Sequence, residues 1–136
     1  MSDPIVFISR NRVRAGMLEE FRRHYHDSIQ PIEEGKPGTL VQLAYLSEDA
    51  AEVVIFRLFP SPEALDLQLQ GADERSKAAY RFIEPASIEI YGMPGSYAMG
   101  MISKIAGSGV DVRIHPQFIG GFIRPQSGRA ISPEQI

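Results

Sequence analysis

The hydrophobic pattern of the first part of the chain changes from the period of a strand to that of a helix. Residues 5–14 begin with four consecutive apolar side chains and then alternate polar and apolar positions, which predicts a strand. In residues 14–37 the apolar positions recur every three or four residues, the spacing of a helix with one buried face. These positions are Leu18, Phe21, Tyr25, Ile29 and Ile32. We expect this helix to begin at Met17 and to end within residues 32–35.

Two further strands follow the helix. Residues 39–46 and 52–59 predict strands joined by a polar turn of hairpin length over residues 47–51. Apolar side chains occupy both faces of these strands almost throughout, whereas a hairpin with water on one side shows a clean alternation. We therefore expect the sheet to be covered twice, once by its own helices and once by something else.

A second helical region begins at Ser61, which suits an N-cap, and Pro62, which suits the first helical position. Gly71 interrupts it, and a helical pattern resumes over residues 72–83. Residues 87–91 predict a fourth short strand. The resulting order of strand, helix, strand, strand, helix, strand is that of the ferredoxin-like α+β sandwich, an antiparallel sheet with both helices on one face.

The composition changes at the end of this unit. We divide the chain into a ferredoxin-like domain over residues 1–92 and a C-terminal extension over residues 93–136, which forms no separate domain. Residues 96–105 have one or two turns of helical period, and residues 110–114 and 118–123 are short apolar runs. These two runs predict either a short hairpin or an arm that crosses a partner subunit.

The open face of the predicted sheet requires a partner. It carries valine, isoleucine, leucine and phenylalanine side chains, and little chain is left over to cover them. A second copy of the same sheet is the simplest cover for such a surface. We therefore expect a homodimer that also binds a small apolar ligand.

Composition and charge exclude several classes of protein. The 136 residues include 14 basic and 17 acidic side chains, for a formal net charge of −3 without long runs of either sign, so no nucleic-acid footprint is expected. The absence of cysteine excludes disulfides, thiolate nucleophiles and cysteine-ligated metals. No apolar run approaches the ~20 residues of a membrane-spanning helix, and no secretory signal opens the chain. We expect a cytoplasmic protein without membrane or nucleic-acid partners.

Several positions match residues of a known family. They are Gly16 between the first strand and helix, Phe21 in that helix, Pro37 and Gly38 before the second strand, Phe59 at the end of the third, and the helix start Glu63, Ala64 and Leu65. With this order of elements, residues 5–91 resemble the antibiotic-biosynthesis-monooxygenase-like proteins of the dimeric α+β barrel superfamily. The resemblance implies a homodimer whose two sheets form a barrel, with a pocket between each sheet and its helices.

The resemblance also implies a range of activities. Members include cofactor-free oxygenases of aromatic polyketides and quinols, haem-degrading enzymes and proteins without an established reaction. The oxygenases commonly carry a tryptophan at the end of the third strand and a histidine in the second helix, where this chain has Phe59 and Gln68. We expect a cofactor-independent monooxygenase acting on an apolar aromatic or quinol-like compound, or else a non-catalytic dimeric ligand-binding or structural protein of the same fold.

The candidate site residues are polar side chains on otherwise apolar strands, together with His24 beside the buried stripe of the first helix and Phe59 at the end of the third strand. An arginine there could hold an anionic or enolate-like substrate, amide side chains could donate to a developing oxyanion, and a tyrosine or histidine could move a proton. The catalytic candidates are His24, Arg57 and Tyr91, and the substrate-binding candidates are Asn11, Gln42, Phe59 and Glu89. The structural alternative is an internal ion pair between Arg57 and Glu89.

The histidines bear on metals and cofactors. His24 and His26 lie two residues apart in the predicted helix and point about 200° from each other, so they cannot share a metal ion. We expect neither a metal nor a cofactor. A haem-degrading enzyme would need an axial histidine in the pocket, which only His24 or His26 could supply.

Overall fold

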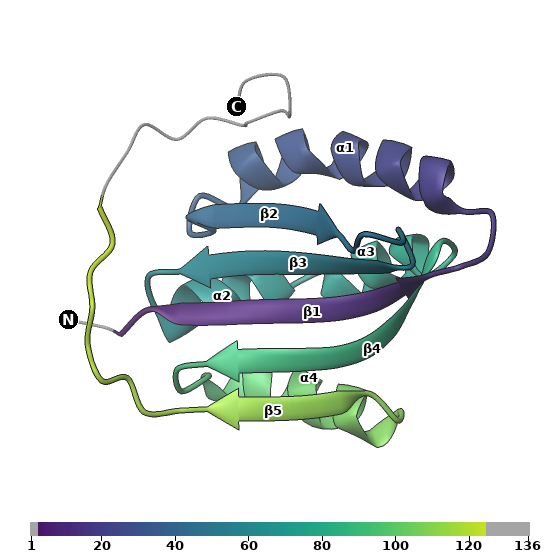
Figure 1. Ribbon diagram of the computed structural model, residues 1–136. Coiled ribbons are helices and arrows are strands. Elements are labelled where there is room, and N and C mark those ends of the chain that lie inside the picture. Colours follow the sequence, from purple (N-terminus) through teal and green to yellow (C-terminus); the bar gives the residue numbers. More distant parts are fainter. Residues whose placement is uncertain (1–2, 125–136) are drawn as a thin grey trace.

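The computed structural model describes residues 3–124 and contains one five-stranded sheet with four helices against one of its faces (Figure 1). The elements are β1 Ile5–Val13, α1 Leu18–Gly35, β2 Val41–Leu46, β3 Glu52–Phe59, α2 Pro62–Leu69, α3 Ala72–Ala79, β4 Ile83–Tyr91, α4 Ser96–Gly107 and β5 Asp111–His115. This arrangement confirms the predicted α+β class and its ferredoxin-like order.

The strands lie in the order β2-β3-β1-β4-β5, and β1 pairs with both β3 and β4. All neighbours are antiparallel except β4 and β5, which run parallel because α4 crosses over between them. The four strands of the ferredoxin-like unit are therefore antiparallel as predicted, and β5 of the extension makes the whole sheet mixed. β4 also begins four residues earlier than expected, since a register shift beside Pro85 lets the strand continue through it.

The extension contributes directly to this sheet. The weak helical period predicted over residues 96–105 is a helix of 12 residues, α4, and the next apolar run is β5. The predicted hairpin between the two apolar runs is wrong, because β5 bonds to β4 and residues 116–124 contain neither helix nor strand. Gly120 and Gly121 adopt φ angles of 152° and 142°, a conformation that does not continue a strand.

Two groups of buried apolar side chains join the helices to the sheet. The central cluster lies between β1, β3, β4, α2 and α4, and it contains Ile5, Phe7, Phe59, Ala64, Leu65, Ile88, Ile90, Ala98 and Ile102. The α1 cluster contains Phe21, Val53, Ile55 and Ile83. Burial of each large apolar side chain contributes about 1.5–3 kcal/mol to folding. Both clusters lie on the helix-covered face and take their buried strand residues from β1, β3 and β4, while Ala44 and Leu46 of β2 are partly buried against the α1 cluster.

The helix starts follow local capping rules. The predicted N-cap Ser61 accepts a hydrogen bond from the Ala64 amide at 3.2 Å, as a serine cap does. α4 has no cap of its own, and the Asp66 carboxylate on α2 accepts from its Ala98 amide at 3.1 Å. The negative charge also suits the positive end of the α4 dipole, so α2 fixes where α4 begins.

The opposite face of the sheet carries no helix in the described part of the chain (Figure 1). Its half over β2, β3 and the start of β1 is apolar, with Val6, Ile8, Val41, Leu43, Tyr45, Val54, Phe56 and Leu58. Its other half over β4 and β5 is polar. Tyr45 and Leu43 keep 62% and 38% of their surface exposed, so this apolar half is left uncovered by the described chain.

Gly92 is a position where the fold requires glycine. Its φ is +111°, and a Cβ there would lie 2.9 Å from both Ile5 Cγ1 and the Pro4 carbonyl oxygen. Gly92→Ala is expected to lower the free energy of unfolding by about 1–3 kcal/mol, measured by urea denaturation. Gly100→Ala is the matched control, since this helical glycine is exposed with nothing within 4 Å, and it should stabilise by up to ~1 kcal/mol. Equal unfolding midpoints for the two variants would contradict this account.

Candidate functional site

Arg57 brings a positive charge onto the helix-covered face of the sheet. It lies on β3 between Ile55 of the α1 cluster and Phe59 of the central cluster. It pairs across the sheet with Phe7 and Gln42, and its Nε donates to the Gln42 Oε1 at 2.9 Å. The side chain is only partly exposed, and within residues 3–124 it forms no ion pair. Its partner is thus a neutral amide.

The surroundings of Arg57 disfavour its charge. Burial lowers the pKa of Arg57 to about 10. The positive charge of Arg75 also lowers this pKa, whereas the interaction with Tyr25 raises it. Burial also raises the pKa of the Tyr25 hydroxyl, while a hydrogen bond with Gln42 and the charge of Arg57 act in the opposite direction. At neutral pH both side chains therefore keep their protons. Arg57 remains a cation with N–H donors and no neutralising carboxylate.

Gln68 and Arg75 extend this polar group toward α2 and α3. The buried Gln68 side chain accepts from Thr39 Oγ1 at 2.7 Å. Arg75 donates from Nη1 to the Gln70 carbonyl at 3.2 Å and from Nη2 to the Gln68 carbonyl, and it thereby caps the end of α2.

Tyr25, Thr39, Gln68 and Arg75 were not predicted as site residues. Tyr25 could have been found from the sequence, because it lies on the apolar stripe of α1. Arg75 could not, because α3 has no buried residues that would mark one of its faces.

Of the other predicted residues on the covered face, Asn11 and His24 lie apart from Arg57, whereas Phe59 is its neighbour along β3. Asn11 is buried, but it faces Val53, four residues or ~13 Å along β3 from Arg57. Its amide donates to the Val53 carbonyl at 3.5 Å. His24 packs its ring 5.4 Å from that of Phe82. Phe59 is wholly buried in the central cluster, so its role in the structure is that of a core residue.

The predicted ion pair between Arg57 and Glu89 is wrong. In the register of the sheet Arg57 lies beside Phe7, whereas Glu89 lies beside Ile8. Adjacent strand residues point to opposite faces, so the two charges are separated by the sheet itself. Glu89 instead accepts from Arg10 Nε at 2.8 Å and from the Tyr91 hydroxyl at 2.5 Å.

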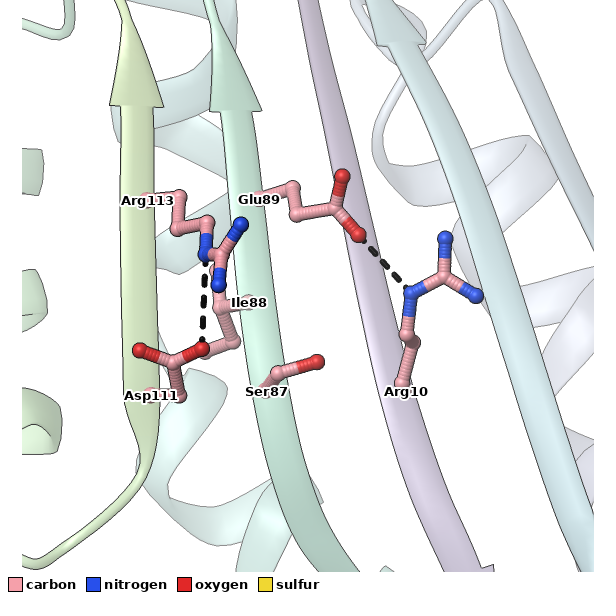
Figure 2. A pocket seen from close by; sticks show the side chains of 6 residues that line it. All are labelled: Arg10, Ser87, Ile88, Glu89, Asp111 and Arg113. Atoms are coloured by element: carbon pink, nitrogen blue, oxygen red, sulfur yellow. Dashed lines mark hydrogen bonds and ion pairs between the residues drawn. The ribbon is translucent and has the colours of Figure 1, made fainter.

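A second polar group occupies the open face over β1, β4 and β5. It surrounds a hollow of about 260 Å³ lined by Arg10, Ser87, Ile88, Glu89, Asp111 and Arg113. Figure 2 shows the Glu89 carboxylate turned toward Arg10 and the Arg113 guanidinium above Asp111. Beside it, the rings of Tyr91 and His115 stack with centroids 5.0 Å apart. Each arginine here has an acidic partner, so the group is electrostatically balanced.

The two polar groups differ in what they offer a ligand. The open-face group is neutralised internally, while the group around Arg57 has cations and neutral donors but no acidic partner from residues 3–124. An anionic or polarised oxygen would supply the missing charge, so we take the Arg57 group as the candidate site. Among residues 3–124, no group of three or more histidine, aspartate or glutamate side chains could hold a metal ion, and no helix could cross a membrane.

The fold and the site together define an α+β protein of ferredoxin-like topology with a polar group between its sheet and its helices. No protein-family model and no curated protein matches the chain. Solved structures do match it, and we compare three of them.

MupZ from Pseudomonas fluorescens is 14% identical, with a TM-score of 0.70 over 91% of this chain and 97% of that one. SnoaB, a cofactor-independent oxygenase from Streptomyces nogalater, is 15% identical, with a TM-score of 0.58 over 70% and 97% of the two chains. A protein from Caulobacter crescentus, provisionally described as an antibiotic biosynthesis monooxygenase, is 19% identical, with a TM-score of 0.58 over 65% and 88%. The chain therefore has the fold of the antibiotic-biosynthesis-monooxygenase-like proteins, which confirms the predicted resemblance at the level of the fold.

The extent of these matches also informs the extension. Residues 5–91 make up less than two thirds of the chain, close to the share covered in the comparisons with SnoaB and the Caulobacter protein. The match to MupZ covers 91% of the chain and must therefore continue well beyond residue 91. That match therefore includes at least part of the region that forms α4 and β5 here.

The open-face group makes a prediction about pH. Tyr91 and then Arg10 hold the pKa of Glu89 below its usual value of 4.5. A depressed pKa stabilises the fold above the unfolded-state pKa, and this contribution is lost as the pH falls through the folded-state pKa. Glu89→Gln should therefore cost up to about 1 kcal/mol near pH 7, and the difference from the wild type should shrink below about pH 4, measured by urea denaturation. A difference that stayed constant with pH would refute this assignment.

Proposed function

We propose that this protein is a small-molecule enzyme of the cofactor-independent monooxygenase type. Its substrate would be an apolar aromatic or quinol-like compound bound between α1 and the sheet. The observation that carries the proposal is the Arg57 guanidinium, which is partly buried, hydrogen-bonded to Gln42 and without an acidic partner in residues 3–124. The likeness in fold to SnoaB, itself a cofactor-independent oxygenase, supports the reaction class.

The chemistry requires an electron-rich anion of the substrate. A phenol or an acidic ring carbon that loses a proton can pass electrons to dioxygen without help from a cofactor. Oxidation of a ring methylene to a carbonyl consumes one dioxygen, of which one oxygen atom enters the product and the other leaves as water. The substrate supplies all the electrons, so no external reductant is consumed.

The side chains of the site would stabilise this anion. Arg57 would donate from its Nη groups to the substrate oxygen as charge develops there, an interaction that strengthens in the transition state. Gln42 would hold the guanidinium in place, since its side-chain oxygen accepts from Arg57 Nε. The predicted proton acceptor His24 packs against Phe82 away from Arg57, so we assign it no part in this site. Tyr91 and Glu89 lie on the other face and have no part in this site.

Oxygen uptake tests the proposal. With a panel of quinols and anthrones, the protein should consume one dioxygen per substrate. Arg57→Ala should lower kcat/KM by about 10²-fold or more, because it removes the donor to the developing anion. Arg113→Ala is the matched control, an exposed arginine on the other face, and should retain wild-type activity.

Two results would count against a monooxygenase. One is no uptake above buffer for any compound, and the other is an Arg57→Ala variant as active as the wild type. Binding of such compounds through Arg57 without any oxygen uptake would instead favour the alternative of a non-catalytic ligand-binding protein of this fold.

We also propose that the protein is a homodimer in which the open face of each sheet meets that of its partner. The apolar half of that face supports this, since large apolar patches on soluble proteins commonly mark interaction surfaces. Tyr45 and Leu43 are its most exposed large side chains. A second copy offers the same apolar surface, which suits an isologous contact.

Light scattering at micromolar concentration should give twice the chain mass of 15.1 kDa. Tyr45→Glu should shift the protein toward the monomer, because it would place a charge in the buried apolar contact. Leu67→Glu is the control, since Leu67 is 55% exposed on the helical side and should leave the dimer intact. A monomeric wild type would contradict the proposal.

A further inference from the structure

We propose that the site around Arg57 recognises an aromatic hydroxy acid, with the substrate carboxylate bound jointly by Arg57 and Arg75. This inference rests on the proposed function for the place of the site, and it adds the chemical class of the ligand. It follows from the two guanidinium groups of the site, from the neutral acceptors that hold them and from the lack of an acidic partner within residues 3–124.

The site contains two guanidinium groups from different elements. Arg57 stands on β3 and is held through Nε by Gln42 at 2.9 Å. Arg75 stands on α3, and the carbonyls of Gln68 and Gln70 at the end of α2 hold its two Nη atoms. Neither arginine forms an ion pair within residues 3–124. Two positive charges are therefore positioned by neutral acceptors alone.

The connections of the two arginines lead to the same strand. Gln68, whose carbonyl binds Arg75, accepts through its buried side chain from Thr39 at 2.7 Å. Thr39 directly precedes β2, and Gln42, which binds Arg57, is the second residue of β2. Arg75 is thus connected, through Gln68 and Thr39, to the end of β2 that carries the partner of Arg57. In agreement, the charge of Arg75 contributes to the lowered pKa of Arg57.

Burial distinguishes these two arginines from the others of residues 3–124 that lack an ion pair, since Arg14, Arg23, Arg81 and Arg124 are exposed to water. On the open face Arg10 lies 2.8 Å from Glu89, and Arg113 lies 3.5 Å from Asp111. Those arginines are also more exposed to water, where a partner matters less. Arg57 and Arg75 are the more buried arginines and have no acidic partner within residues 3–124. This points to a ligand that carries the negative charge.

The donor geometry selects the kind of anion. A guanidinium presents its N–H groups in a planar fork that matches the two oxygens of a carboxylate. Arg57 uses only Nε toward the protein, so its Nη groups remain for a ligand. A neutral quinol would leave both cations without a counter-charge. A carboxylate beside a ring hydroxyl supplies one oxygen pair for the two cations and keeps the oxidisable ring that the proposed reaction needs.

Binding of two probes to the full chain tests this inference by calorimetry. The probes are 1-hydroxy-2-naphthoate and 1-naphthol, which share the ring and hydroxyl and differ in the carboxylate. The wild type should bind the naphthoate at least about tenfold more tightly. Arg57→Gln and Arg75→Gln should each remove most of that preference while changing the affinity for 1-naphthol little. Arg113→Gln should keep the full preference.

Arg75 also caps α2, so loss of binding in its variant could reflect a disturbed helix. Arg75→Lys addresses this, because it keeps the charge and should retain part of the preference, and a thermal melt checks that each variant is folded. Equal wild-type affinity for the two probes, or a preference that survives both Arg57→Gln and Arg75→Gln, would overturn the inference.

The failure of this inference and the failure of the proposed function are distinguishable. Oxygen uptake with neutral quinols, without any preference for the naphthoate, would refute the hydroxy acid and leave the monooxygenase in place. An arginine-dependent preference for the naphthoate, without oxygen uptake on any compound, would support the binding site and refute the reaction.

Discussion

Within residues 3–124 the helices cover only one face of the sheet, and successive residues of each strand point to opposite faces. Each strand side chain therefore lies either among the helices or on the open face. On the central strand β1, Phe7 lies beside Arg57 and Ile90, whereas the next residue, Ile8, lies beside Phe56 and Glu89. A shift of one residue in this register would exchange the two environments. The register therefore places Arg57 among the helices and leaves Glu89 with Arg10 on the open face, and every assignment of function depends on that separation.

A cation on the covered face works against the stability of the fold. Arg57 interrupts the apolar side chains of β3 between Ile55 and Phe59, and Gln42 supplies it with a hydrogen bond but no charge. A guanidinium removed from water without a counter-charge costs free energy, and an apolar residue of similar size would pack there more favourably. Side chains that oppose local stability in this way concentrate at functional sites. This is the physical reason for placing the ligand at Arg57 and not at the better formed but neutralised hollow over β4 and β5.

Much of the fold is predictable from the sequence because it follows from local periods and caps. The strand over residues 52–59 has the predicted bounds, Ser61 caps α2 as expected, and the alternation of β3 correctly places Val53, Ile55 and Arg57 on one face. The errors concern relations between distant segments. Arg57 and Glu89 are both polar residues on apolar strands, and only the pairing through β1 shows that they face apart. Likewise, nothing local reveals that the run after Gly109 pairs parallel to β4, or that Arg75 reaches the site from a short polar helix.

The proposed function depends on an Arg57 that has no acidic partner in residues 3–124 and is available to a ligand oxygen. A crystal structure of the protein with a bound aromatic hydroxy acid tests this most directly, because it locates both the ligand and the guanidinium. The account predicts a ligand oxygen at roughly 2.7–3.2 Å from an Arg57 Nη atom, between α1 and the sheet. An Arg57 paired with an acidic side chain of its own chain or of a second copy, with the ligand bound elsewhere, would contradict it.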